Sequence, residues 1–79
     1  MNPRVQKVSP LDNYKILLFF TNGERGIYDC KELLSFGVFK ELRNKTYFEK
    51  VKVHSGTILW PNEQDICPDT LYVDSLKIV

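Results

Sequence analysis

The side chains best suited to nucleophilic chemistry in this sequence are its one histidine, His54, the neighbouring Ser55, and two cysteines, Cys30 and Cys67. Nucleophilic catalysis requires a base within hydrogen-bonding distance of the nucleophile and a carboxylate that orients the base. Positions along the chain do not establish those contacts, and a serine followed by glycine is typical of a turn. We therefore interpret His54 as a residue at the end of a strand and predict that the chain is not an enzyme.

A second group of candidate ligands consists of Glu63, Asp65 and Asp69, because Ca²⁺ and Mg²⁺ prefer carboxylate oxygens. Their spacing lacks the central glycine and the terminal glutamate of an EF-hand loop. We interpret Asp65 as a loop residue that accepts hydrogen bonds from nearby backbone N–H groups, and Asp69 as a favourable charge at a helix start. We therefore predict no metal site.

Two further patterns argue against a cofactor. The four glycines are scattered instead of clustered before a helix, so no phosphate-binding loop is indicated. The two cysteines lie far apart with no Cys-x-x-Cys pair, so neither a zinc site nor a disulfide framework is indicated. We expect both to be reduced, part-buried thiols, and we predict that the chain binds no cofactor.

Length and charge restrict the class of protein further. At 79 residues we expect a single domain over residues 1–79, with room for one small core. Eleven Lys and Arg residues against ten Asp and Glu give a net charge of +1, which provides no long-range field for a polyanion or a membrane surface. No stretch approaches the roughly 18 apolar residues of a membrane span, and the polar N-terminus does not resemble a secretory signal. We expect a cytoplasmic protein.

Two β-hairpins are expected to position these side chains. Asn22-Gly23 joins residues 14–21 to residues 24–29 and predicts a type I′ turn, and residues 5–9 can add a third strand. A second hairpin is expected around Ser55-Gly56, with Pro61 ending the sheet. We predict an α+β fold with an antiparallel sheet of about five strands, a three-stranded meander plus the second hairpin, and two or three short helices.

The helices are predicted from capping patterns. Residues 29–32 have the spacing of a capping box before an apolar run that ends at Gly37, and residues 46–49 repeat the pattern. Pro68 is suited to the first turn of a helix, because its missing N–H has no partner there. Residues 76–79 are interpreted as a tail of uncertain order.

Trp60 has two interpretations. A tryptophan supplies roughly 150–250 Å² of contact surface and an N–H that requires a partner. In a domain of this size the ring is expected in the core, where it would close the sheet against Leu71 and Tyr72. If the ring instead faces solvent beside Asn62 and Asp65, it is a natural anchor for a protein partner. The same polar and aromatic groups also leave open a site for a small ligand or metal.

The apolar run at residues 16–20 is the strongest indication of a partner. A strand with one wet face should alternate between apolar and polar residues, and this run does not. One face of the strand, either Ile16, Leu18 and Phe20 or the alternate Leu17 and Phe19, must meet the helices. The other face requires the tail, the second hairpin or another subunit. Apolar surface left uncovered there would mark a protein interface.

Nucleic-acid binding is the weaker interpretation of the basic side chains. Glutamates are interleaved with these cations, and no recognition helix or stacking platform is visible. The basic residues concerned are Arg25, Lys31, Lys40, Arg43, Lys45, Lys50 and Lys52. We expect them to solvate a surface, and we predict no direct contact with nucleic acid.

The sequence resembles the small bacterial family of proteins of unknown function called DUF2442, over nearly its whole length. Members of that family run through a Gly-Thr-x-x-Trp-Pro-Asn segment into an Asp-x-x-Pro-[Glu/Asp]-x-Leu-Tyr segment. The matching residues here are Gly56, Thr57, Trp60, Pro61, Asn62, Asp65, Pro68, Asp69, Leu71 and Tyr72. Many relatives carry glycine where this chain has Glu63, which puts a tight turn with positive φ after Asn62 in doubt.

The resemblance also implies a role. Relatives are often encoded beside another small protein, which implies an accessory or antitoxin-like function. The sequence thus favours a non-catalytic protein-interaction module, with a protein partner or a second copy of the chain. The alternatives are a nucleic-acid-associated regulatory module, as in longer relatives with a helix-turn-helix region, and a site for a small ligand or metal. The residues proposed for contact are Leu17, Phe19, Trp60, Asn62, Asp65 and Tyr72.

Overall fold

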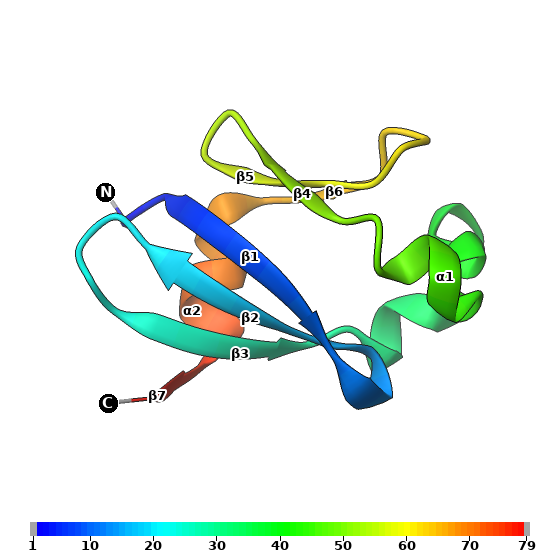
Figure 1. The fold of residues 1–79 in the computed structure, drawn as a ribbon, viewed down its shortest axis with the longest axis horizontal. Helices are drawn as coiled ribbons and strands as arrows, with labels where there is room; N and C mark the ends of the chain where they lie inside the picture. Colours follow the sequence, from blue (N-terminus) through cyan, green and yellow to red (C-terminus); the bar gives the residue numbers. More distant parts are fainter. Residues whose placement is uncertain (1, 79) are drawn as a thin grey trace.

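The computed structural model describes residues 2–78 and confirms the α+β class. Its larger sheet is antiparallel, with the spatial order β1-β2-β3-β7. These strands are β1 (Val5–Leu11), β2 (Lys15–Phe20), β3 (Arg25–Asp29) and β7 (Leu76–Ile78). The smaller antiparallel sheet is made of β4 (Lys52–His54), β5 (Thr57–Leu59) and β6 (Asp65–Ile66). Figure 1 shows the smaller sheet beside the β1 edge of the larger one.

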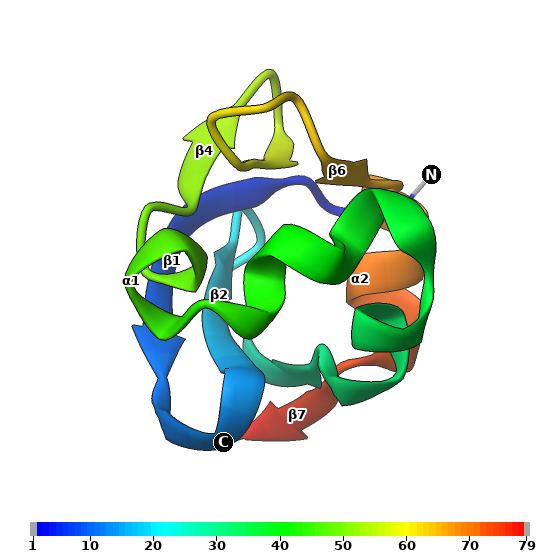
Figure 2. The same ribbon diagram turned by 90° about the vertical axis from the view of Figure 1, so that its right-hand side faces the viewer.

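Helical segments cover one face and one end of the larger sheet. Figure 2 shows α2 against the sheet, while α1 and the turns that precede it in the chain lie at the end nearest the viewer. The α-helices are α1 (Lys45–Phe48) and α2 (Pro68–Asp74), and the 3-10 helices are η1 (Asp12–Tyr14), η2 (Lys31–Ser35) and η3 (Gly37–Arg43). The part of the chain described therefore holds seven strands in two sheets, where the sequence predicted about five in one.

The first hairpin forms as predicted, but with a different turn. Gly23 has a φ of 89°, whereas Asn22 does not have a positive φ, so the type I′ turn is wrong. The backbone N–H of Phe20 donates to the carbonyl of Glu24, at 2.9 Å, and the loop therefore contains three residues. Such loops place a glycine in the left-handed region after a type I turn. Gly23 serves that purpose here.

The type I′ geometry occurs instead in the second hairpin. Ser55 and Gly56 have φ values of 50° and 80°, and His54 pairs with Thr57 across the turn. Pro61 interrupts the sheet after β5, as predicted, yet the chain returns as β6 and pairs with β5. The expectation that the sheet ends at Pro61 is therefore wrong. A strand of two residues is too short to give a hydrophobic alternation that could be recognised in the sequence.

The segment between the hairpins is helical, although not as the capping patterns indicated. Residues 31–35 form a 3-10 helix in place of an α-helix, and Gly37 begins the next 3-10 helix instead of ending the first. The side chain of Asn44, not Thr46, caps α1 by accepting from the N–H groups of Thr46 and Tyr47. Asparagine is among the best N-cap residues, so the helix begins earlier than the pattern predicted.

The C-terminal segment is ordered. α2 begins at Pro68, as predicted, with Asp69 in its first turn and Leu71 fully buried. The chain then reverses, and β7 pairs with β3, where Leu76 lies opposite Ile27. The prediction of a tail of uncertain order is therefore wrong for residues 76–78, and Val79 lies outside the described residues.

The core lies between the larger sheet, the smaller sheet and α2. β2 alternates strictly, with Ile16, Leu18 and Phe20 buried and the residues between them half-buried. The largest side chains that are fully buried come from both sheets, from the helical segments and from the loop after β5. They are Trp60, Phe20, Phe48, Ile16, Leu18, Leu42, Ile58, Leu71 and Cys30.

Candidate functional site

Trp60 belongs to the core, the first of the two roles considered for it. Its exposed fraction is 0%, and its indole N–H donates to the backbone carbonyl of Phe48, at 2.9 Å. The rings of Trp60 and Phe48 also pack together, with their centroids 5.9 Å apart. Because the ring is enclosed and its one polar atom is bonded, Trp60 is not a surface anchor.

The loop after Trp60 is held by a hydrogen-bond network that joins it to η3 and α1. The Tyr47 hydroxyl donates to the side-chain carbonyl of Gln64, at 2.7 Å, and accepts the backbone N–H of Asn62, at 2.8 Å. Glu41 accepts from the side-chain amides of Asn62 and Gln64, at 2.6 and 3.0 Å. Gln64, only 3% exposed, also donates to the carbonyl of Val38. This network fixes the loop, so the side chain of Asn62 is already occupied within the domain.

Glu63 adopts the conformation that the sequence placed in doubt. Its φ is 68°, and its backbone N–H donates to the carbonyl of Trp60, at 2.9 Å. The turn with positive φ is therefore present even without glycine. For a residue with a Cβ atom the left-handed region is strained, at a cost of roughly 1–2 kcal/mol.

Replacing Glu63 with glycine should therefore stabilise the domain by about 0.5–1 kcal/mol, since relief of strain exceeds the entropy gained by the unfolded chain. The measurement is urea denaturation followed by circular dichroism. Asp65→Gly is the matched control, because it also removes an exposed carboxylate but at a position in β6 without positive φ. Equal losses of stability in both variants would contradict the strain argument.

Asp65 and Tyr72 do not lie together with Asn62 in one site. Asp65 is exposed on β6, where it pairs with Leu59, and its side chain makes no hydrogen bond within residues 2–78, so its interpretation as a loop residue that bonds the backbone is wrong. Tyr72, on α2, packs edge-on against Phe20 and donates to Glu24. That bond lowers the pKa of the Glu24 carboxyl and raises the pKa of the Tyr72 hydroxyl. The ligand site considered around these residues is not assembled.

The nucleophile candidates are also separate. His54 is exposed and its side chain makes no hydrogen bond within residues 2–78. Cys30 is fully buried, and burial raises the pKa of its thiol to about 12, so it stays protonated at neutral pH. Cys67 is exposed rather than part-buried, contrary to expectation. Among the described residues, no three His, Cys, Asp or Glu side chains are close enough to hold a metal ion.

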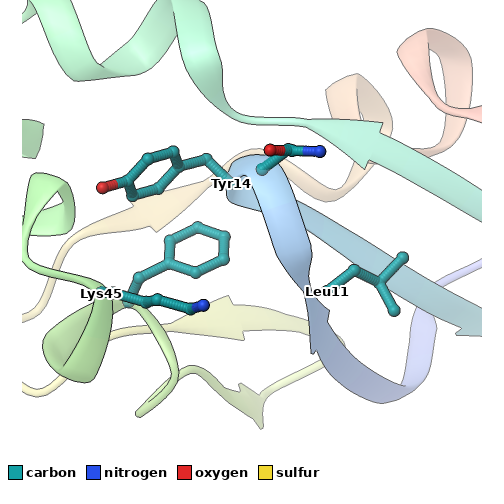
Figure 3. Close-up of a pocket in the computed structure, with 5 residues that line it drawn as sticks. Leu11, Tyr14 and Lys45 are labelled. Carbon is teal, nitrogen blue, oxygen red and sulfur yellow. The ribbon is translucent and has the colours of Figure 1, made fainter.

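One cavity, of about 200 Å³, opens beside the turn between β1 and β2 (Figure 3). It lies next to Leu11, Tyr14 and Lys45, and Figure 3 shows the Tyr14 hydroxyl directed away from Leu11. That hydroxyl donates to the backbone carbonyl of Arg43, while Lys45 lies 3.6 Å from the carboxylate of Asp12. Because these polar groups bond elsewhere and do not converge on the opening, this cavity is not a candidate active site.

The face of the larger sheet opposite α2 is the remaining candidate. Leu17 and Phe19 lie on this face, both half-buried, because the other residues of β2 point into the core. Residues paired across an antiparallel sheet share a face, so Ile27 lies beside Leu17, and Leu76 beside Ile27. Leu76 is 72% exposed. In Figures 1 and 2 no described helix or strand lies over this face. We call it the outer face, with apolar members Leu11, Leu17, Phe19, Ile27, Leu76 and Ile78.

Basic side chains border these apolar residues. Lys7 and Arg25 lie on either side of Phe19, and the Lys7 ammonium is 5.6 Å from the centre of its ring. Lys15 lies on the same face next to Asp29, the one acidic member among the paired residues. The sequence identified only Leu17 and Phe19 here, although strand parity carried across the hairpin would have added the partners from β1 and β3. The outer face is therefore apolar in its middle and cationic around it.

Two of the other basic residues are engaged within the domain. The Arg43 guanidinium donates to the carbonyl of Leu34, at 3.0 Å, and Lys45 is paired with Asp12. Phe48 is buried, and Tyr47 belongs to the network beneath the loop. These aromatic side chains therefore provide no platform on which bases could stack.

Two antiparallel sheets around one core, with short helical segments and an uncovered sheet face, define a small α+β domain. The chain belongs to the DUF2442 family, described as proteins of unknown function, whose family model matches residues 5–75. No match was found among the curated proteins or among the solved structures. Within residues 2–78, no helix is both long and apolar enough to cross a membrane.

Proposed function

We propose that this chain is a cytoplasmic, non-catalytic interaction module that binds another protein through the outer face. The observation that carries the proposal is the row of apolar side chains on β1, β2, β3 and β7, which no described element covers. Contiguous apolar surface bordered by polar groups is typical of protein interfaces. An accessory role beside a second small protein, as in an antitoxin-like pair, is consistent with such a surface.

The charges on the outer face favour a particular kind of partner. Lys7, Lys15 and Arg25 outnumber the single carboxylate of Asp29 on this face. A partner with carboxylates around an apolar centre would complement it, and such complementarity increases the rate of association. A second copy of the chain would bring cations opposite cations, so an acidic protein is the preferred occupant.

The test is a pull-down from cells that express the chain, followed by titration of the purified partner against variants. Phe19→Ser should weaken binding at least tenfold, because a central aromatic side chain is lost, while the core remains intact. Lys7→Glu should also weaken binding. Its effect should grow as the salt concentration falls, because the repulsion between the new carboxylate and an acidic partner is then less screened. Val73→Ser is the matched control, because Val73 is an exposed apolar residue on α2, 65% exposed and away from the outer face.

Two outcomes would count against this function. Equal binding by the Phe19→Ser and Val73→Ser variants would place the interface elsewhere. Association of the purified chain with itself, lost in Phe19→Ser and detected by analytical ultracentrifugation, would identify a second copy as the occupant in place of an acidic protein.

A further inference from the structure

A cavity of about 380 Å³ lies at the end of the larger sheet, and its lining is acidic. Its walls are formed by Tyr28, Asp29, Glu32 and Asp74. The pairing of β3 with β7 ends at Ile27 and Leu76. Asp29 is the last residue of β3, and Asp74, two residues before Leu76, is the last residue of α2. Glu32, from η2, completes the wall. The fold thus brings three carboxylates from three segments to one opening, which we call the acidic pocket.

None of the carboxylates of the acidic pocket forms an ion pair within residues 2–78, although Lys15 is paired with Asp29 across β2 and β3. The one ion pair within residues 2–78 joins Lys45 to Asp12. Asp29 accepts the backbone N–H of Lys31, at 2.9 Å, while Glu32 and Asp74 make no side-chain hydrogen bond within that range. Most of the acceptor capacity of the three carboxylates is therefore available to a ligand.

Tyr28 supplies a second and independent indication of a ligand. The residue is only 9% exposed, and its hydroxyl makes no hydrogen bond within residues 2–78. No fully enclosed side-chain oxygen or nitrogen in that range lacks a partner, so the hydroxyl retains some exposed surface. Tyr28 lines the acidic pocket, and the charges of Asp74, Glu32 and Asp29 act on its hydroxyl. Burial, together with the nearby Cys30 and the carboxylates, raises the pKa of Tyr28. The hydroxyl therefore remains neutral and can accept or donate one bond to a ligand.

The spacing of the carboxylates selects the kind of cation. Within residues 2–78 no three acidic, histidine or cysteine side chains are close enough to share one metal ion. A planar guanidinium presents five N–H donors in a fixed fork, so it can bond carboxylates that are too far apart for a single ion. We propose that the acidic pocket binds a guanidinium group, as in arginine and its derivatives. This inference does not rest on the function proposed for the outer face.

The experiment is a two-dimensional NMR titration of the isotope-labelled chain with N-acetyl-arginine amide. The expected result is saturable shifts of the backbone signals of Asp29, Glu32 and Asp74, with a dissociation constant in the millimolar range typical of one small group in an open site. The citrulline counterpart has the same shape without the charge and should cause no saturable shift. Mg²⁺ is titrated separately. The same saturable shifts with citrulline or with Mg²⁺ would overturn the proposal, as would the absence of shifts with arginine amide.

Variants test whether these residues form the site. Asp74→Asn should weaken binding of arginine amide about tenfold, the effect of one hydrogen bond to a charged group, and Tyr28→Phe several-fold. Asp65→Asn, an exposed carboxylate on β6, is the matched control and should bind like the wild type. If the Asp74→Asn variant is folded, as shown by its NMR spectrum, and binds arginine amide with wild-type affinity, the assignment of the site to the acidic pocket is wrong.

Two further titrations address separate questions. The first identifies the source of the ligand, and the second distinguishes this proposal from the one made for the outer face. Tighter binding of an arginine-containing peptide than of agmatine would indicate that the guanidinium group belongs to an arginine side chain of a protein. The reverse would indicate that it belongs to a small molecule. Phe19→Ser should leave the arginine titration unchanged, because Phe19 is absent from the lining of the acidic pocket. A negative result for the outer-face proposal can therefore be distinguished from a negative result for the acidic-pocket proposal.

Discussion

Replacement of Trp60 by alanine should lower the free energy of unfolding by about 3–5 kcal/mol, the usual cost of truncating a large aromatic side chain in a core. Trp60 is fully enclosed, and its loss leaves the carbonyl of Phe48 with only the longer bond from the backbone N–H of Val51, at 3.4 Å. A domain of this length has a total stability on the order of 4–12 kcal/mol. The variant should therefore be largely unfolded or close to it at ambient temperature.

The measurement is urea denaturation followed by circular dichroism, because the variant has lost the only tryptophan. Trp60→Phe separates the two contributions, since it keeps a ring but not the N–H, and its cost should be intermediate. Leu76→Ala is the control for removal of an exposed apolar group and should change stability by less than about 0.5 kcal/mol. A cooperative transition of Trp60→Ala at the same urea concentration as Leu76→Ala would contradict the assignment of Trp60 to the core.

Substitution of Gly26 by alanine should destabilise the domain by about 1–3 kcal/mol, the range observed when an extra methyl group overpacks a core. A Cβ atom at this buried position would lie 2.6 Å from the hydroxyl oxygen and 3.0 Å from the Cβ of Ser75. Ser75 joins α2 to β7, so the added methyl group would push this corner away from the sheet. Backbone dihedrals are not the reason, because Gly26 has no positive φ.

A double-mutant cycle tests this packing argument directly. In a Ser75→Gly background both close contacts are removed, and the nearest remaining atom, from the Phe20 ring, is 3.4 Å away. Gly26→Ala should therefore cost much less in that background, as expected for residues that touch. The same loss of stability with and without the Ser75 side chain would show that the clash is not the cause.

Local patterns predicted those parts of the fold in which neighbouring residues determine the backbone. The Ser55-Gly56 hairpin and the start of α2 at Pro68 depend on dihedral preferences within a few residues, and both are confirmed. β6 and β7 were missed, because two or three residues are too few for a periodic signal and their partners lie elsewhere in the chain. The capping pattern at Thr46 was misleading, because Asn44, two residues earlier, is a strong N-cap residue and accepts the N–H groups of Thr46 and Tyr47.

The contact residues proposed from the sequence show the same limit. Leu17 and Phe19 were identified because a continuous apolar run contradicts the pattern of a strand with one wet face, and that signal is local. Trp60 and Asn62 were grouped with Asp65 and Tyr72 by proximity in sequence, whereas the fold assigns them to different surroundings. The acidic pocket was not anticipated at all, because its residues come from three segments whose proximity depends on the β3–β7 pairing.

That pairing also bears on the order in which the domain can form. The first three strands are joined by short connections, so they can associate while the rest of the chain is still disordered. β7 reaches β3 only after the whole middle of the chain, including the smaller sheet and α2, has been enclosed in one long loop. Non-local contacts of this kind form late, because the entropy of closing the loop is lost before the strand gains its bonds. During synthesis, the edge of β3 therefore stays unpaired until β7 has emerged.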